Sequence, residues 1–446
     1  MNTQFKIGSC REIITPPLGT PLYGYTDYRP ASSVLDDLTV NAIYCEQGFL
    51  RGVMISADIV SITKEITETI RELINKETDI PKENISFSAT HTHSGPAIKS
   101  SGGWGSANLE YINGTLIPMT VKAAKKASQT AVPALLGVGT TQSLVGINRR
   151  EIAENGEILL GQNPFGVCDT TMTVLAFKDL EGKNILNIIH YSCHGTSAGR
   201  TTEITRDWQG IMVDGLELQT GAMSVFFNGS EGDMGPRLSN GGTVGDTFSE
   251  TGEVLNSTLK YMKEIGALAS LDANRAFKSI KEYREVDFNI MKGTIKLPYK
   301  PIPTLEEAKE KLVKLGPPET HVMVQKREYA ALNQTIKMYE NNEKFDDCMQ
   351  FHQVMFAFNS TVFVPFPFEL FSEIALRLRQ YSPFENTLCT CNTNDSHFYL
   401  PTKDQMEKGG YEIEIFLYAN VYKLKNDTDD TIIKENLRIM REYLNK

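Results

Sequence analysis

The residues best suited to chemistry lie in one short stretch, the run Thr-His-Thr-His-Ser-Gly-Pro at residues 90–96. The chain holds only 7 histidines, and a single residue separates two of them here, His91 and His93. Residues 83–88 before them alternate apolar and polar side chains, which is typical of a short strand. In an extended chain, side chains two residues apart point to the same face, so both imidazoles should face the same way. Two imidazoles before a tight turn predict half of a metal site, and the alternative is a chance pair of structural histidines.

Further polar side chains follow the ends of predicted strands elsewhere in the chain: Asp58, His194, Asp233, Glu369, and the pair His397 and Tyr399. In open α/β sheets, ligands bind beyond the carboxyl ends of the strands, where such side chains can meet. Histidine, carboxylate and phenol groups without thiolates predict a mononuclear metal centre with nitrogen and oxygen ligands. That donor set suits a catalytic zinc ion with an open position for water. We interpret Asp58 and Asp233 as carboxylates that organise the loops around the ligands.

The elements that must position these residues predict an α/β fold of mixed sheets flanked by helices, with the active site at the carboxyl ends of the strands. Apolar runs predict strands at residues 51–59, 171–177, 184–191, 223–227 and 356–364. Segments with one apolar face predict helices at residues 64–75, 207–219 and 370–381. We expect a single large domain spanning residues 1–446, in which the charged, amphipathic segment 300–350 forms a helical insertion or lid.

Composition excludes two classes of partner. The 45 lysines and arginines against 55 aspartates and glutamates give a net charge of -10, and this field repels nucleic acid and anionic membranes. No stretch approaches the roughly 18 apolar residues of a transmembrane segment, and the first residues lack the apolar core of a secretory signal. We therefore expect a cytoplasmic protein with its 7 scattered cysteines reduced. The sequence leaves the oligomeric state open.

A competing motif occurs at residues 195–199, where Gly-Thr-Ser-Ala-Gly matches the nucleophile elbow of serine hydrolases. That motif needs a helix directly after the serine, but residues 200–206 are rich in β-branched side chains. His194 also precedes the serine, whereas the triad histidine of that fold comes later in the chain. A loop or capping role for Ser197 is the simpler interpretation.

Five motifs occur in an order that resembles the neutral/alkaline, non-lysosomal ceramidases: Ala-Thr-His-Thr-His-Ser-Gly-Pro at 89–96, Asn-Arg at 148–149, His-Gly-Thr-Ser at 194–197, Gly-Asp-Met-Gly-Pro at 232–236 and Tyr-Leu-Pro-Thr at 399–402. The opening segment through Gly24 and Tyr25 also resembles the start of that family's catalytic domain. The resemblance implies a ceramidase-like catalytic domain, without the C-terminal immunoglobulin-like domain that full ceramidases carry.

The same resemblance implies a zinc-dependent hydrolase that cleaves a linear amide bond with a metal-activated water. By position, the residues that resemble the ligands of one zinc ion per chain are His91, His194, Glu369 and Tyr399. His93 resembles the histidine that handles the proton or contacts the substrate amide. Arg149 resembles an arginine that helps to stabilise the oxyanion, and Tyr411 resembles a tyrosine that hydrogen-bonds the same group.

One departure bears on the substrate. The family segment Gly-Asp-Val-Ser-Pro-Asn appears here as Gly-Asp-Met-Gly-Pro-Arg at residues 232–237, so a serine is lost and Arg237 is gained. This argues against ceramide itself and favours a small-molecule or lipid-like amide whose acidic or polar acyl group contacts Arg237. Two alternatives stay open: a metal-dependent or serine esterase using Ser197, and a metal-binding protein without catalysis.

Overall fold

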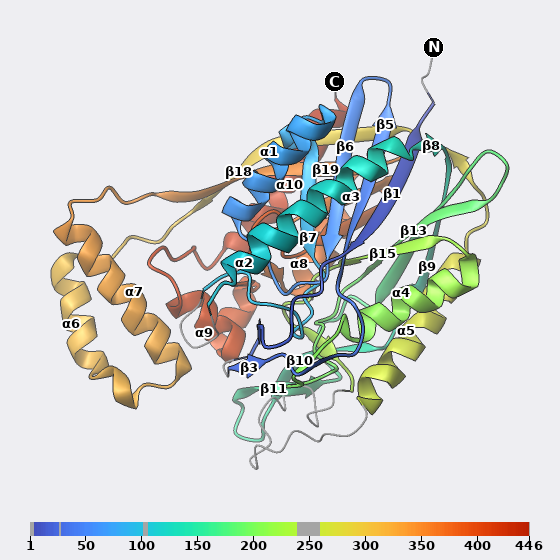
Figure 1. The fold of residues 1–446 in the computed structure, drawn as a ribbon. Coiled ribbons are helices and arrows are strands. Elements are labelled where there is room, and N and C mark those ends of the chain that lie inside the picture. The colour runs from blue at the N-terminus through green and yellow to red at the C-terminus, as the bar shows by residue number, and fades with distance from the viewer. Residues whose placement is uncertain (1–3, 26–27, 101–105, 239–258, 446) are drawn as a thin grey trace.

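Three mixed sheets form the body of the protein, with helices packed on their outer faces (Figure 1). The computed structural model describes residues 4–25, 28–100, 106–238 and 259–445. Apolar side chains from all three sheets, among them Ile7, Leu175 and Phe356, belong to one shared core cluster. Burial of such a cluster is the main favourable term in folding. The predicted α/β fold of mixed sheets flanked by helices is confirmed.

The three sheets are defined by their strand orders. The first has the order β7-β6-β5-β1-β8, with β1 (Lys6–Ile13), β5 (Thr39–Gln47), β6 (Leu50–Ala57), β7 (Ile85–Ala89) and β8 (Val132–Pro133). The second has the order β15-β13-β12-β9-β17, with β9 (Leu135–Gln142), β12 (Thr171–Lys178), β13 (Asn184–Tyr191), β15 (Met223–Asn228) and β17 (Arg284–Glu285). The third has the order β18-β19-β20-β22, with β18 (Phe288–Pro298), β19 (Cys348–Phe358), β20 (Thr361–Pro365) and β22 (Asn386–Thr390).

Each sheet contains one parallel pair joined by a helical crossover. The pairs are β6 with β7, β13 with β15, and β20 with β22. Their crossovers contain α1 (Lys64–Thr78), α4 (Asp207–Thr220) and α8 (Ser372–Tyr381) respectively. The chain therefore repeats one arrangement three times, although its sequence shows no internal repeat. Five predicted site residues follow the carboxyl ends of these strands: Asp58, His91, His194, Asp233 and Glu369.

The crossover helix α1 illustrates how the sequence specifies these elements. Thr63 caps its first turn by accepting a hydrogen bond from the amide of Ile66, and Asp79 ends the helix in the left-handed conformation. Ile70 and Ile74 are four residues apart, so they lie on one face, and both are fully buried in the core of the first sheet.

Other elements connect or extend the sheets. The remaining helices are α2 (Leu109–Tyr111), α3 (Ile117–Gln129), α5 (Lys260–Lys278), α6 (Leu305–Leu315), α7 (Met323–Glu340), α9 (Tyr411–Tyr418) and α10 (Thr428–Leu444). The strands outside the three sheets are β2 (Pro21–Leu22), β3 (Arg29–Pro30), β4 (Ser33–Val34), β10 (Gly146–Ile152), β11 (Ile158–Asn163), β14 (Glu203–Ile204), β16 (Met234–Pro236), β21 (Glu369–Leu370) and β23 (Tyr399–Leu400). Strand β10 pairs with both β11 and β16.

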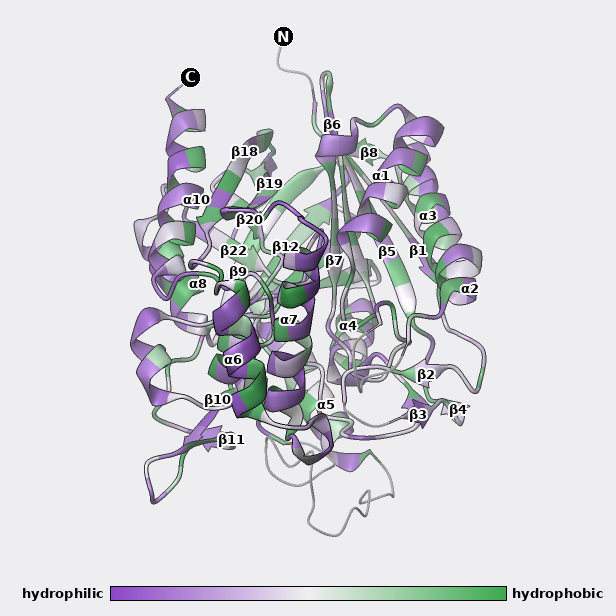
Figure 2. Ribbon diagram, turned by 90° about the vertical axis from the view of Figure 1, so that its left-hand side faces the viewer, coloured by the Kyte–Doolittle hydropathy of each residue, from purple (hydrophilic) through white to green (hydrophobic). Residues whose placement is uncertain are grey.

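Helices α6 and α7 form a hairpin between the long paired strands β18 and β19 (Figures 1 and 2). A capping box at Thr304 and Glu307 fixes the start of α6. The hairpin lies to one side of the sheets in Figure 1, and α7 packs against α9. Two helices thus occupy the segment 300–350, and their action as a lid stays a prediction.

One strand prediction is wrong. Residues 356–364 do not form a single strand, because β19 ends at Phe358 and β20 starts at Thr361. Asn359 between them has φ 53°, a left-handed conformation that asparagine tolerates well and that closes a two-residue hairpin turn. The apolar residues on both sides of the turn concealed it.

Candidate metal centre and catalytic site

Residues from three different sheets meet at one place. His91 follows β7, His194 follows β13, and Glu369 follows β20 as the first residue of β21. The loops are tied together by their backbones: the amide of His93 donates to the carbonyl of Gly195 at 3.0 Å. The carboxyl ends of the parallel strand pairs therefore gather the side chains that the sequence places far apart.

His91 has an unusual backbone conformation. Its φ of 67° lies in the left-handed region, which non-glycine residues seldom occupy outside functional sites. Its Nδ1 lies 2.7 Å from the carbonyl oxygen of Val60. A carbonyl only accepts, so Nδ1 carries the proton and Nε2 keeps a free lone pair. Strand β7 ends at Ala89, so the expected extended chain through His93 is wrong: a left-handed turn brings the two rings to the same side.

His194 is held in the same tautomer. Its Nδ1 lies 2.7 Å from the carbonyl oxygen of Glu231 and 3.0 Å from that of Met234. Its buried Nε2 has no hydrogen-bond partner among the described residues. Burial lowers the pKa of His194 to about 3 and also lowers the pKa of His91. Both rings are therefore neutral at pH 7, the form that binds a metal.

Glu369 completes a set of three donors. Its Oε2 lies 3.2 Å from Nε2 of His194 and 3.6 Å from Nε2 of His91, without hydrogen-bond geometry to either. Burial raises the pKa of Glu369, but the two histidines outweigh this and hold it below its usual range. Donors bound at 2.0–2.1 Å to one tetrahedral zinc ion lie roughly 3.3 Å apart. The unprotonated Nε2 atoms of the two histidines and an unpartnered carboxylate oxygen at these separations fit a zinc ion.

His93 joins the same cluster. Its Nε2 lies 3.2 Å from Nε2 of His91, and donor atoms of His91, His93 and His194 all lie within 4.8 Å of one another. Gly24, with φ 111°, packs against the ring, and a Cβ there would lie 2.5 Å from Nδ1 of His93. Burial, together with His91 and His194, lowers the pKa of His93 well below its usual value. Its predicted part in proton handling stays a prediction.

Arg149 approaches this cluster from β10. Its Nε donates to Oε1 of Glu412 at 2.9 Å, while Arg150 donates to Oε2 of the same carboxylate at 2.8 Å. With both Glu412 oxygens engaged, Nη2 of Arg149 is left buried without a hydrogen bond among the described residues. Burial opposes its charge, but Tyr399 and Glu412 raise the pKa of Arg149 above its usual value. A permanently charged donor thus lies beside the cluster.

The two predicted tyrosines lie next to each other. Tyr399 is the register partner of Glu369 in the parallel pair β21 and β23, and Tyr411 begins α9. Their ring centroids are 5.8 Å apart, and the guanidinium of Arg149 lies 5.3 Å from the centroid of Tyr399. Burial raises the pKa of Tyr411 to about 12, and burial with Glu369 raises the pKa of Tyr399 well above its usual value. Both phenols keep their protons near neutral pH.

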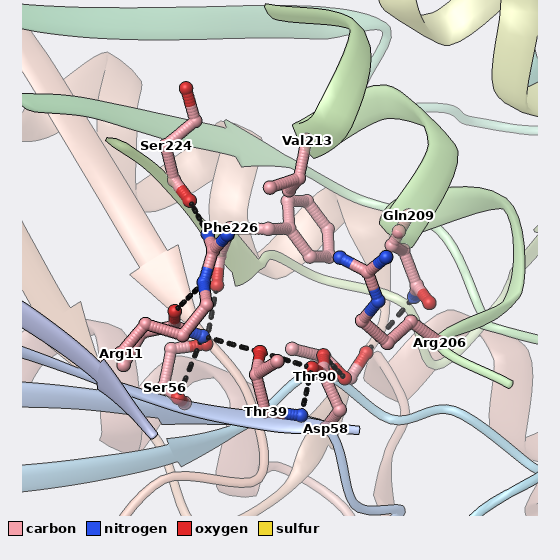
Figure 3. Close-up of a pocket in the computed structure, with 12 residues that line it drawn as sticks. Arg11, Thr39, Ser56, Asp58, Thr90, Arg206, Gln209, Val213, Ser224 and Phe226 are labelled. Carbon is pink, nitrogen blue, oxygen red and sulfur yellow. Dashed lines mark hydrogen bonds between the residues drawn. The ribbon is translucent and has the colours of Figure 1, made fainter. Parts of the chain in front are cut away.

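Asp58 lies beneath the histidine loop, at a small polar cavity shown in Figure 3. Its Oδ2 accepts hydrogen bonds from the amide and hydroxyl of Thr39 at 2.9 and 2.7 Å, and its Oδ1 accepts from the hydroxyl of Thr90 at 3.3 Å. Gln209 donates to the carbonyl of Thr90 at 3.0 Å. Thr90, the residue before His91, is thereby held by hydrogen bonds to Asp58 and Gln209.

Asp233 joins two other site elements. Its Oδ1 accepts from the amide and hydroxyl of Ser372 at 2.8 and 2.7 Å, and its Oδ2 accepts from Asn148 at 3.2 Å. Its backbone carbonyl accepts from the amide of Arg149 at 2.9 Å. Burial raises the pKa of this carboxyl to about 7. Asp233 thus links the strand of Arg149 to the start of α8, three residues after Glu369.

Two predicted residues have partners away from the cluster. Arg237 donates from Nε to the carbonyl of Leu144 at 2.9 Å, and none of its hydrogen bonds within the described residues reaches the three histidines or Glu369. Ser197 donates to the carbonyl of Leu238 at 2.6 Å, and the segment after it contains the short strand β14 rather than the helix of a nucleophile elbow. Substrate binding by Arg237 stays a prediction, and the geometry disfavours a serine nucleophile.

The structure adds residues that the sequence did not single out. Glu231 is fully buried beside the cluster, and its donor atom lies within 4.8 Å of those of His91 and Glu369. Lys99 donates to the carbonyl of Ser396 at 3.2 Å, close enough to Glu369 for their charges to interact. Glu231 follows the end of a strand, as the predicted ligands do, and that pattern could have identified it. Nothing in the local sequence marks Lys99.

Comparison with solved structures supports the description of the fold. A neutral ceramidase from Pseudomonas aeruginosa superposes with a TM-score of 0.73 at 19% identity, covering 99% of this chain and 74% of that one. A ceramidase complexed with C2 gives a TM-score of 0.71 at 16% identity, covering 99% of this chain and 76% of that one. No curated protein sequence matches the chain. None of the helices in the described part of the chain has the length and apolarity of a membrane span.

The decisive match is at the level of sequence families. The N-terminal domain of the neutral/alkaline non-lysosomal ceramidases matches residues 5–289, which contain His91, His93, Arg149 and His194. This match spans more than half of the chain, and the superpositions extend the likeness of fold to the remainder. The chain belongs to the neutral/alkaline non-lysosomal ceramidase family.

Proposed function

We propose that this protein is a zinc-dependent hydrolase that cleaves a linear N-acyl amide bond. The observation that carries the proposal is the convergence of three donor atoms, Nε2 of His91, Nε2 of His194 and Oε2 of Glu369, in one cluster. The last two of these atoms have no hydrogen-bond partner among the described residues. Family membership supports a hydrolase, and the donor chemistry supports zinc. Tyr399, beside Glu369 in the sheet, is the fourth proposed ligand.

The zinc ion, when bound, would activate a water molecule for attack on the amide carbonyl and polarise that carbonyl. The protein's own residues supply the remaining chemistry. Arg149 keeps a charged Nη2 group without a hydrogen bond to the described residues, and this group can stabilise a developing oxyanion. The Tyr411 hydroxyl is the second proposed donor to that oxygen. His93 is neutral and buried beside the cluster, so it can accept a proton and return it to the leaving amine.

Rigidity of this arrangement comes from the surrounding network. Backbone carbonyls fix the tautomers of both histidine ligands, which orients their lone pairs before any metal binds. The shared carboxylate of Glu412 fixes the Arg149 guanidinium in the same way. Preorganised donors of this kind lower an activation barrier because they need no rearrangement in the transition state.

For the substrate, we propose a small-molecule or lipid-like amide other than ceramide. Support comes from the residues that replace the serine and asparagine of the family segment, Gly235 and Arg237. The cation Lys99 near Glu369 adds to the polar character of the site. Both observations favour an acyl or amine group that carries polar or acidic atoms.

A substrate panel tests the proposal. Purified protein is assayed on N-acyl amides and matched esters, ceramide included, before and after removal of metal with a chelator and after restoration of zinc. We expect amide hydrolysis that disappears with the chelator and returns with zinc. Hydrolysis that resists the chelator, with labelling of Ser197 by a fluorophosphonate, would instead show a serine esterase. Zinc binding without hydrolysis of any compound would show a metal-binding protein.

A further inference from the structure

We propose that Glu231 is a further ligand of the metal centre, which gives the site a second carboxylate beside Glu369. This inference rests on the metal-dependent function proposed above. It concerns a residue outside the four ligands expected from the family resemblance. The observations that carry it are the position of the side chain, its unsatisfied oxygen and the charge that surrounds it.

Position is the first observation. Glu231 lies on the loop after β15 and has no solvent exposure. Its Oε1 accepts a hydrogen bond from Nδ2 of Asn392 at 2.7 Å, whereas its Oε2 has no partner among the described residues. Donor atoms of Glu231, His91 and Glu369 lie within 4.8 Å of one another, close enough to hold one ion. A buried carboxylate oxygen without a hydrogen bond is costly unless a cation or a donor meets it.

The loop of Glu231 is fixed against the loop of Glu369. The amide of Gly232 donates to the carbonyl of Leu370 at 2.8 Å. A Cβ at position 232 would lie 2.4 Å from the carbonyl oxygen of Glu369, so only glycine allows this approach. The carbonyl of Glu231 also accepts the Nδ1 proton of His194. One residue thus orients a histidine ligand through its backbone and presents a carboxylate through its side chain.

The charge of the neighbouring side chains is a further observation. The carboxyl groups of Glu231 and Glu369 lie in one cluster whose other donors are imidazoles. Arg149 acts on Glu369 but is bonded through Nε to Glu412. A divalent cation between the carboxylates would compensate both charges at once. Additional oxygen donors also widen the range of metals that the site accepts, toward manganese and cobalt.

Three variants separate a ligand from a structural residue. Glu231→Gln keeps an Oε1 acceptor for Asn392 but replaces the second oxygen with an amide NH2 group, which does not bind a metal. Glu231→Asp keeps a carboxylate on a shorter side chain. Asp272→Asn, a buried carboxyl on α5 that pairs with Arg275, is the matched control. Each metal-free protein is titrated with zinc against a chromophoric chelator, loaded with cobalt for visible absorption, and unfolded thermally without metal.

We expect Glu231→Gln to bind zinc about 100-fold more weakly than wild type and to shift the cobalt absorption bands, because the coordination number changes. Its metal-free form should unfold at the wild-type temperature or above it, because the carboxylate repulsion is gone. Glu231→Asp should recover part of the affinity, and Asp272→Asn should match wild type in both metal measurements.

Two results would overturn the inference while the proposed function stands. One is unchanged zinc affinity in Glu231→Gln. The other is weaker binding with wild-type cobalt bands, which would mean that Glu231 acts only by positioning His91 and His194. A wild-type protein that binds neither zinc nor cobalt would overturn both the inference and the proposed function.

Discussion

Two carboxylate regions adjoin the histidine loop, and they differ in how their oxygens are satisfied. Both oxygens of Asp58 accept hydrogen bonds, from Thr39 and Thr90, and Arg206 lines the same cavity (Figure 3). In the other region, Oε2 of Glu369 and Oε2 of Glu231 have no hydrogen-bond partner within the described residues. Asp58 and Glu231 are buried and the side chain of Glu369 is only 13% exposed, so burial alone does not distinguish the two regions.

The difference indicates what each region is for. A fully paired buried carboxylate holds loops together and has no remaining capacity for a ligand. Unpaired carboxylate oxygens beside free imidazole nitrogens are unfavourable in the protein alone and become favourable when a cation binds. We therefore expect substitutions in the two regions to affect different measurements: metal binding and hydrolysis for the histidine–glutamate cluster, and folding stability for the Asp58 region.

The largest effect should come from removing a donor of the cluster. His194→Ala and Glu369→Gln should each lose stoichiometric zinc and reduce kcat/KM on an N-acyl amide by at least about 1,000-fold. His397→Ala is the control, since this histidine pairs with Asp395 outside the cluster and should keep zinc. Metal analysis and steady-state kinetics measure both quantities. Zinc retained by His194→Ala would contradict the assignment of the cluster.

The next largest effect, on kcat, should distinguish Arg149 from Arg150, which each donate a hydrogen bond to Glu412. Arg149→Gln should lower kcat by about 100- to 1,000-fold with zinc still bound, because an oxyanion donor is lost. Arg150→Gln should reduce stability comparably, since it also leaves Glu412 with one partner, but should change kcat by less than about tenfold. Kinetics and denaturant unfolding of the two variants test this. Equal losses of kcat would show that both arginines act only on structure.

The Asp58 region should respond in the opposite way. Asp58→Ala removes the acceptor for Thr39 and Thr90 and should lower the free energy of unfolding by about 3 kcal/mol. Variant molecules that remain folded should still bind one zinc ion. Urea unfolding and zinc content of the soluble protein provide the two values. A variant that folds with wild-type stability and yet loses zinc would remove the distinction between the regions.

The smallest effect at neutral pH concerns His190, a buried histidine outside the cluster whose Nε2 lies 2.6 Å from the carbonyl of Cys389. Burial lowers its pKa to about 4, below the value of about 6.5 expected in the unfolded chain. The folded protein then binds fewer protons, so the associated stability is complete above pH 6.5 and is lost as the pH falls toward 4. The loss amounts to about 3 kcal/mol.

Unfolding of metal-free wild type and His190→Gln at pH 7 and pH 4.5 measures how much of the stability lost at low pH is due to His190. The difference in stability between the two proteins should shift in favour of the variant at the lower pH. A difference that is independent of pH would mean that His190 does not titrate between its unfolded and folded values.

The sequence predicted the position of the site because strand ends are readable from apolar runs. His91, His194 and Glu369 each follow such a run, and they meet where parallel strands end. The convergence of His91 and His93 was predicted for the wrong reason, since strand alternation was expected and a left-handed residue was found. A local pattern of side chains contains no information about a turn that long-range contacts with other loops stabilise.

Glu231 and the turn at Asn359 show the other limits of prediction from sequence. A carboxylate at a strand end has the same local signature whether its oxygens are paired, as in Asp58, or free, as in Glu231. Only the tertiary structure determines whether such an oxygen accepts a hydrogen bond, because the donors come from distant segments of the chain. At Asn359, apolar residues on both sides hid a two-residue turn that separates β19 from β20.

The most direct test of the account is anomalous X-ray scattering at the zinc edge from crystals of the protein soaked in zinc. We predict one strong peak per chain, in contact with Nε2 of His91, Nε2 of His194 and a carboxylate oxygen of Glu369. The polar cavity beside Asp58 should show no peak. Zinc bound away from these three donors, or no peak among them at saturating zinc, would contradict the claim that this cluster is a metal centre.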